Sequence, residues 1–186
     1  MHRQPLLSLL HQHLQHHRFA DANEQAMTQE TIMFVEQHPD CFERTLLVGH
    51  VTGSAWIIGR DRGHSDEPRV VLIHHRKLDR WFQPGGHADG DPDVAAVALR
   101  EAQEETGLTS LQLVSPAIFD VDIHSIPALD SKPAHLHYDI RFLLEADPEE
   151  PFGITDEVQN IRWFSLKEAN SYAKSESIFR MIQKML

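Results

Sequence analysis

The segment at residues 84–108, PGGHADGDPDVAAVALREAQEETGL, constrains this chain more than any other. A Pro-Gly-Gly turn leads into an acidic loop and then into a helix-forming run that stops at Gly107. Positions three and four apart lie on the same face of a helix, so Glu101, Glu104 and Glu105 project together. Three carboxylates on one face repel one another unless a hard cation lies among them, and Mg²⁺ and Mn²⁺ prefer such oxygen ligands. The spacing therefore predicts a divalent metal site on this helix.

The residues at both ends of this run predict where the helix begins and ends. Asp91 is a good N-cap residue, and Pro92 suits the first helical position because the N–H that proline lacks would be unpaired there anyway. Gly107 suits the left-handed position that follows a helix. We therefore expect the helix to begin at Pro92 and to end just before Gly107.

The same segment resembles the Nudix box, the motif of the Nudix hydrolases, whose pattern is G-x5-E-x7-R-E-U-x-E-E-x-G-U with U a bulky aliphatic residue. The matching residues are Gly86, Arg100, Glu101, Glu104, Glu105, Gly107 and Leu108. Two positions depart from the pattern, because Pro92 stands where the first Glu belongs and Ala102 where a larger aliphatic residue is usual. We expect Ala102 still to face the core.

We expect Pro92 to affect how the loop is held more than it affects catalysis. In the family, the first Glu helps hold the loop by pairing with the Arg, whereas the metal ligands are mainly the later acids. In this chain Asp89, Asp91 or Asp93 could pair with Arg100 instead.

The resemblance implies a fold, an activity and a cofactor. The fold is an α/β/α sandwich with a mixed sheet, which the alternation of strands and helices also suggests. The activity is hydrolysis of the pyrophosphate bond of a nucleoside diphosphate linked to another moiety X, by attack of water on phosphorus with Mg²⁺ or Mn²⁺ as cofactor. Two alternatives are a non-catalytic Nudix-fold binding or regulatory domain, favoured by Pro92, and a Nudix-fold isomerase, which would need Cys41 at the site.

The resemblance also assigns roles to residues. The implied metal ligands are Glu101, Glu104, Glu105, the backbone carbonyl of Gly86, and Asp89. The implied catalytic residues are Glu104, Glu105, Arg100 as an orienting residue, and Glu157, which matches an acid that many Nudix enzymes carry just before a late strand. The alternative for Glu157 is a charged residue in a surface turn.

A strictly alternating strand provides the candidate substrate contacts. In residues 135–142, HLHYDIRF, the polar side chains His135, His137, Asp139 and Arg141 share one face, and apolar ones share the other. These polar residues could line a substrate cleft, with Arg141 on a phosphate and His137 and Asp139 near the metal. They could also form the solvated face of an edge strand. His87, beside the double Gly, is a further candidate for contact with phosphate.

The length and composition limit the other possibilities. A chain of 186 residues is ample for one domain, and its net charge of −11 disfavours binding to bulk nucleic acid but permits a small phosphate substrate bound through cations. A single cysteine excludes an internal disulfide and fits a reducing compartment. The longest apolar start, at residues 6–10, is too short for a membrane span or signal peptide. We therefore expect a cytoplasmic protein that binds no membrane.

The rest of the chain predicts the organisation of a single domain, residues 1–186. An amphipathic helix is expected at 5–17, and a second helix at 22–37, capped near Asp21 or Asn23 and ending before Pro39. Together they form an extension, residues 1–44, that packs on the core or serves as a homodimer contact. The core, residues 45–186, should contain strands near 46–58, 69–74, 111–122, 135–145 and 158–164, and a broken helix from 166. The histidines at 11–17 are interpreted as surface residues, and Trp81 and Phe82 as core residues.

Overall fold

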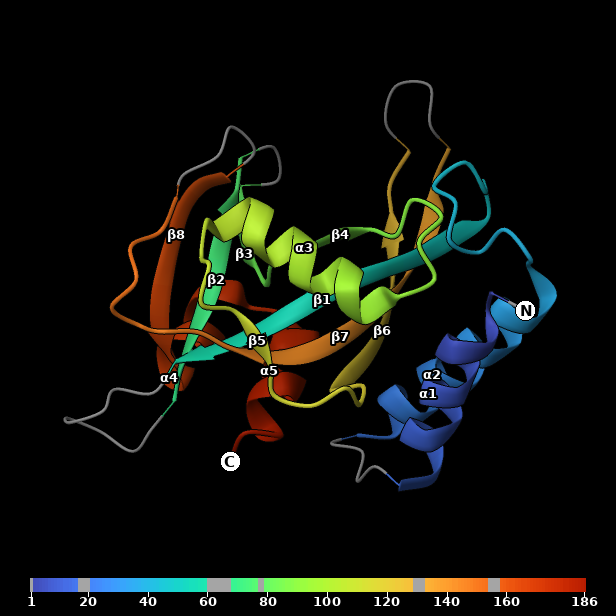
Figure 1. Cartoon of the computed structure of the whole chain (residues 1–186), viewed down its shortest axis with the longest axis horizontal. Coiled ribbons are helices and arrows are strands. Elements are labelled where there is room, and N and C mark those ends of the chain that lie inside the picture. The colour runs from blue at the N-terminus through green and yellow to red at the C-terminus, as the bar shows by residue number, and fades with distance from the viewer. Residues whose placement is uncertain (1, 17–20, 60–67, 77–78, 129–132, 154–157) are drawn as a thin grey trace.

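A computed structural model describes residues 2–16, 21–59, 68–76, 79–128, 133–153 and 158–186. Within them the chain forms one sheet flanked by helices on both faces (Figure 1). The strands are β1 (Gly49–Gly59), β2 (Arg69–His75), β3 (Arg80–Phe82), β4 (Gly85–His87), β5 (Gln112–Leu113), β6 (Asp120–Ile126), β7 (His135–Glu145) and β8 (Val158–Ser165). The helices are α1 (Gln4–His16), α2 (Ala22–Gln37), α3 (Val94–Thr106), α4 (Leu166–Ala173) and α5 (Glu176–Gln183).

The sheet is mixed and is built around β1 and β7. These two long strands run parallel, whereas the other pairings are antiparallel, and the order β3-β2-β1-β7-β5 is joined by β4 on β1, β6 on β7 and β8 on β2. A parallel pair needs a crossover connection, and the chain between β1 and β7 includes α3. The box helix therefore packs directly on β1.

Alternate residues of β1 enter two different cores. Val51, Ala55 and Ile57 pack with α3 and with the N-terminal helices. Trp56 and Ile58 pack on the opposite face with Phe164 and with the apolar sides of α4 and α5. Because side chains of a strand alternate between faces, this burial on both sides explains why β1 contains no charged residue.

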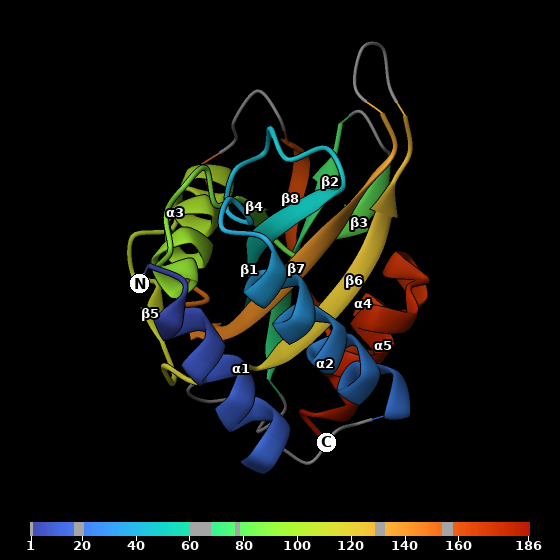
Figure 2. The ribbon, with the colours of Figure 1, turned by 90° about the vertical axis from the view of Figure 1, so that its right-hand side faces the viewer.

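The helical extension packs on the body of the protein rather than standing apart from it. Asp21 caps α2 by accepting a hydrogen bond from the Glu24 N–H at 2.8 Å. Phe34 of α2 stacks on Tyr138 of β7 with ring centroids 3.8 Å apart. Figure 2 shows α1 and α2 lying together against the sheet. The apolar stripe of α1 is therefore covered within the chain, and its use in a homodimer stays a prediction.

Two expected boundaries are wrong. The strand expected at 111–122 is two strands, β5 and β6, separated by residues that include Pro116, which has no N–H to donate to a sheet. The box helix begins at Val94 with Asp93 as its N-cap, accepting from the Ala96 N–H at 3.1 Å. Asp91 instead accepts a hydrogen bond from the Asp93 N–H at 2.9 Å. Asp91, Pro92 and Asp93 therefore form a turn that precedes the helix.

The other expected elements are confirmed. The helix after residue 166 breaks at Lys174, whose φ of 48° is left-handed, and resumes as α5. Gly107 ends α3 with a φ of 71°. Ala102 faces the core and is fully buried, as predicted for the shorter aliphatic residue of the box. None of the described helices is both long and apolar enough to cross a membrane.

Candidate active site

The double glycine of the box lies between β1 and α3. Strand β4 places Gly86 opposite Gly53 and Gly85 opposite Ser54. A Cβ at Gly86 would come within 2.1 Å of Glu101 Oε2, and a Cβ at Gly85 within 2.1 Å of Ser54 Oγ. At Gly85 a side chain would also meet the Cβ of Ser54 at 2.7 Å and its Cα at 2.8 Å, whereas at Gly86 it would displace the flexible carboxylate end of Glu101. The Glu101 carboxylate therefore lies directly against Gly86. Glu101 and the Gly86 carbonyl are the two groups predicted to bind the same metal ion.

Glu105 connects the helix to the same turn. Its Oε2 accepts a hydrogen bond from the Gly85 N–H at 2.9 Å. Glu101 and Glu105 are four residues apart on α3, so they lie one above the other and both face the turn. The predicted common face of the acids is therefore the face that meets β4.

The electrostatics of this face suit a cation. The Glu101 side chain is 19% exposed, whereas that of Glu104 is 63% exposed. Burial raises the pKa of the Glu101 carboxyl above its usual value, the neighbouring charges of Glu104 and Asp89 raise it further, and Arg100 opposes the shift. A positive ion beside these carboxylates would stabilise their ionised form and so oppose the raised pKa.

Arg100 lies between the loop and the acids of the helix. It donates to the carbonyl of His87 at 3.3 Å and to Glu101 Oε1 at 3.1 Å. Its guanidinium nitrogens also lie 3.9 Å from carboxylate oxygens of Asp91 and Glu104. Of the three aspartates that could replace the missing box Glu, Asp91 is thus the one that forms an ion pair with Arg100 among the described residues. These contacts hold the loop against α3 and suit an orienting role for Arg100.

Asp89 has a partner that the sequence did not predict. Its carboxylate accepts from Nε and a terminal nitrogen of Arg44, in the connection before β1. This two-point hydrogen bond is the main reason that the pKa of Asp89 lies below its usual value. Asp89 remains close enough to Glu101 to raise its pKa. A role as metal ligand would therefore require Asp89 to share its carboxylate with Arg44.

The donor set of this region fits a hard divalent cation. Carboxylates and a backbone carbonyl are the oxygen ligands that Mg²⁺ and Mn²⁺ prefer, and Mg²⁺ commonly keeps several waters. Among the described residues, a trio of ligand atoms within 4.8 Å of one another is formed by His50, His135 and His137 rather than by these acids. The carboxylates would therefore hold such an ion partly through its waters.

Arg141 and Asp139 lie inside the protein, in contrast to the predicted contact with phosphate. The Arg141 side chain is 2% exposed, and its Nε donates to Asp139 at 2.8 Å. Its other nitrogens pair with Asp120 at 3.1 Å and Asp122 at 3.2 Å. Its guanidinium is satisfied by three carboxylates, so no part of it is directed at a substrate. The alternating pattern predicted the polar face correctly, but neighbouring β6 supplies acids that the pattern of β7 alone could not show.

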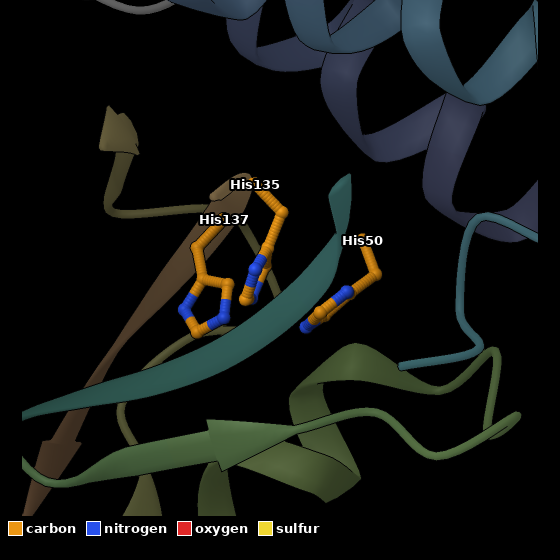
Figure 3. Close-up of side chains that lie close together, drawn as sticks. All are labelled: His50, His135 and His137. Carbon is orange, nitrogen blue, oxygen red and sulfur yellow. The ribbon is translucent and has the colours of Figure 1, made fainter. Parts of the chain in front are cut away.

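His137 belongs to a group that the sequence interpretation missed. The ring of His137 lies 4.8 Å from that of His50 and 5.3 Å from that of His135 (Figure 3). The ring of His87 lies 5.2 Å from His137, so two predicted substrate contacts do lie together. The sequence contained a signal for His50, because this histidine at the start of β1 lies on the same face of the strand as the polar residues Thr52 and Ser54.

Three further predictions have simple outcomes. Glu157 lies outside the described residues. Trp81 packs in the second core, with its ring edge-on to Phe164 at 4.9 Å, which supports the core interpretation. Cys41 is fully buried, and burial raises the pKa of its thiol to about 11, as expected for an unreactive cysteine and not for one in an isomerase site.

Comparison with known proteins defines the family. The sequence model of the NUDIX domain matches residues 51–185. The chain is similar to the asymmetrical bis(5'-nucleosyl)-tetraphosphatase of Rattus norvegicus, at 31% identity over 60% of this chain and 70% of that protein. It is also similar to the RNA pyrophosphohydrolase of Acidiphilium cryptum, at 34% identity over 47% of this chain and 42% of that protein. Among solved structures, a binary complex of C. elegans Ap4A hydrolase has the same fold, with a TM-score of 0.58 and 19% identity over 72% of this chain and 93% of that one.

The chain therefore belongs to the NUDIX family. This confirms the resemblance drawn from the box, the α/β/α fold class, and the expectation of a hydrolase that acts on phosphorus-containing anhydrides.

Proposed function

We propose that this chain hydrolyses the pyrophosphate bond of a nucleoside diphosphate linked to another moiety X, and that Mg²⁺ or Mn²⁺ is required. The observation that supports the proposal most is the contact of Glu101 and Glu105 with the Gly85-Gly86 turn, which brings acidic oxygens and glycine backbone together. The names of the relatives are consistent with it, since one acts on a dinucleoside tetraphosphate and another on an RNA pyrophosphate.

In this proposal Glu101, Glu104 and Glu105 hold the cation, with the Gly86 carbonyl and Asp89 as further ligands. The cation would neutralise the diphosphate and lower the pKa of a bound water. Water oxygen forms a bond to phosphorus, the bond from phosphorus to the bridging oxygen breaks, and the leaving phosphate keeps the electron pair. The proton of the water passes to a carboxylate, for which Glu105 and Glu157 are the candidates.

Arg100 would act by position rather than by contact with the substrate. Its hydrogen bonds to Glu101 and to the His87 carbonyl hold the acidic face of α3 against the loop. His87 and His137 remain the proposed substrate contacts from the polar face of the sheet, whereas Asp139 and Arg141 would support them from inside the fold. The buried single thiol fits a reducing compartment, so the cytoplasm remains the proposed location.

A panel of substrates tests this function. Dinucleoside polyphosphates, nucleotide sugars and 5'-triphosphorylated RNA would be incubated with Mg²⁺ or Mn²⁺, and products identified by mass spectrometry. We expect cleavage of at least one P–O–P bridge, abolished by EDTA and by Glu105→Gln. If these compounds bind but no bridge is cleaved with either ion, the chain is a non-catalytic binding domain, the alternative that Pro92 favours.

A further inference from the structure

Three histidines on two neighbouring strands meet on the polar face of the sheet. His50 of β1 is paired in parallel register with His137 of β7, and His135 precedes it by two positions on the same face. One ring nitrogen from each of the three lies within 4.8 Å of the others. Figure 3 shows the three side chains extending from the two strands with their rings toward a common point.

Three of the six ring nitrogens in this histidine trio (His50, His135 and His137) lack the partners that buried polar atoms normally have. Within the described part of the chain, both nitrogens of His50 and Nε2 of His137 are buried and accept or donate no hydrogen bond of good geometry. Nδ1 of His135 lies 2.9 Å from the Pro133 carbonyl, so it carries the proton and Nε2 keeps its lone pair. Buried nitrogens without partners are costly, and a group that completes them would be bound favourably.

The charge state of the trio distinguishes between classes of ligand. Burial is the main cause that lowers the pKa of His50 to about 4, with the neighbouring His87 and His135 adding to it and the backbone at Leu46 opposing it. Burial likewise lowers the pKa of His137 to about 3, and His124, His50 and His87 add to the shift. The rings of His50 and His137 therefore offer lone pairs instead of positive charge. Neutral imidazole is the form that binds a transition metal.

We propose that His50, His135 and His137 form a binding site for one Zn²⁺ ion. Imidazole nitrogen suits Zn²⁺, whereas Mg²⁺ and Mn²⁺ prefer the oxygen ligands of α3. Three protein nitrogens leave a fourth position of a tetrahedral ion for water. The chain therefore carries two metal sites of different chemistry, a hard one on the box helix and a softer one on the sheet.

The location gives the softer site a structural consequence. Zn²⁺ there would connect β1 to β7 at the end of their parallel pairing, and Thr52, two residues beyond His50, pairs with His87 of β4. The ion would thus stabilise the strands that support the box turn. Because the ligand atoms already lie within 4.8 Å of one another, binding should raise the stability of the fold without a large rearrangement.

Metal-free protein, prepared with EDTA and exchanged into chelator-free buffer, tests the proposal. Isothermal titration at pH 7 should give one tight Zn²⁺ site, and Co²⁺ should produce the visible absorption of a tetrahedral nitrogen-ligated ion. Zn²⁺ should raise the Tm by a few degrees. His135→Ala and His137→Ala should each weaken Zn²⁺ binding on the order of 100-fold. His11→Ala, which removes an exposed histidine of α1, should leave the affinity unchanged.

Two results would overturn the proposal. One is the absence of a tight Zn²⁺ site in the wild-type protein. The other is unchanged affinity in both His135→Ala and His137→Ala together with lost affinity in Glu105→Gln, which would place the ion among the acids of α3. The proposed hydrolysis is assayed separately with Mg²⁺, so its failure would leave this titration unaffected.

Discussion

The protein contains two groups of carboxylates that differ in how their charges are balanced. On α3, the mostly buried Glu101 and the exposed Glu104 both lie beside Arg100. In the loop before it, Asp91 also lies near Arg100, whereas Asp89 pairs with Arg44. The ion network under β6 and β7, formed by Asp120, Asp122 and Asp139 with Arg141 and Arg180, is almost completely buried. Lys184, which follows the end of α5, joins it through Asp120 and also pairs with Glu24 of α2 at 2.5 Å.

The difference appears in the direction of the pKa shifts. Burial alone would raise the pKa of Asp122 and Asp139, but in the ion network the charges and hydrogen bonds of their partners, the arginines above all, reverse the shift, so both pKa values are lowered. On α3 the single arginine does not offset burial and like charge, so the pKa of Glu101 is raised. Carboxylates whose charge is balanced inside the protein support the fold, whereas carboxylates left in excess are suited to an external cation.

The largest expected effect is a loss of turnover when the carboxylates of α3 are changed. Glu104→Gln and Glu105→Gln should each lower kcat by roughly 10²–10⁴-fold while the fold persists, because each removes an anionic ligand or a proton acceptor. Steady-state kinetics at saturating Mg²⁺ measures this. Gln103→Ala, on the exposed side of the same helix, should retain wild-type kcat. Near-native kcat in both glutamine variants would mean that the metal site lies elsewhere.

The balanced group should respond through stability instead. Arg141→Ala leaves three buried carboxylates without their shared cation, which costs about 3–5 kcal/mol and should lower the Tm by roughly 6–20 °C for a domain of this size. The KM for a diphosphate substrate should hold. Thermal unfolding and KM would be measured on one preparation. A raised KM with an unchanged Tm would restore Arg141 as a phosphate ligand.

Acid should weaken the ion network selectively. The folded pKa of Asp122 and Asp139 lies below the unfolded value of about 3.9, so their contribution is present above that pH and is lost as the pH falls through it. We expect the Tm to decline below about pH 4, and Arg141→Ala to show a shallower decline. An equally steep decline in the variant would show that other carboxylates control acid unfolding.

Glu101→Gln should separate stability from activity. Because the folded pKa of Glu101 is raised, its ionised form costs stability at neutral pH, and that cost disappears as the pH falls. In metal-free protein the variant should therefore keep its Tm or gain about 1–2 °C. In a separate assay with Mg²⁺, the variant should lose hydrolysis. Differential scanning calorimetry without metal gives the comparison. A clear loss of Tm would mean that the Glu101–Arg100 contact supports the fold.

The smallest expected effect is that of the departure from the box. Pro92→Glu should change kcat by less than about two-fold, because Asp93 already caps α3 and Asp91 already lies beside Arg100. Kinetics of the single variant beside the wild type measures it. A large gain in turnover would show that the proline leaves the loop poorly held, and would favour the binding-domain alternative for the natural chain.

Much of the fold could be predicted from local patterns. The periodicity of apolar residues predicted α1, the capping residues and Pro39 predicted α2, and the alternation in residues 135–142 predicted β7 and its polar face. The start of α3 could not be fixed, because Asp91 and Asp93 are both suitable caps and the backbone turn at Pro92 decides between them. The strand expected at 111–122 was wrong because apolar residues that cover a core look like a strand when their partners are unknown.

The sequence by itself determined the family, the acidic face of α3 and the two glycines beside it, because these depend on spacings within about 25 residues. Only the tertiary structure decided which charged residues are paired with an opposite charge inside the protein. Arg141 meets acids of β6 and lies beside Arg180 of α5, and His50 meets His137 across a parallel pairing of strands 87 positions apart in the chain. Whether a side chain is free to bind a ligand depends on the charges and lone pairs that face it in space, and in this protein those come from strands and helices that no local pattern connects.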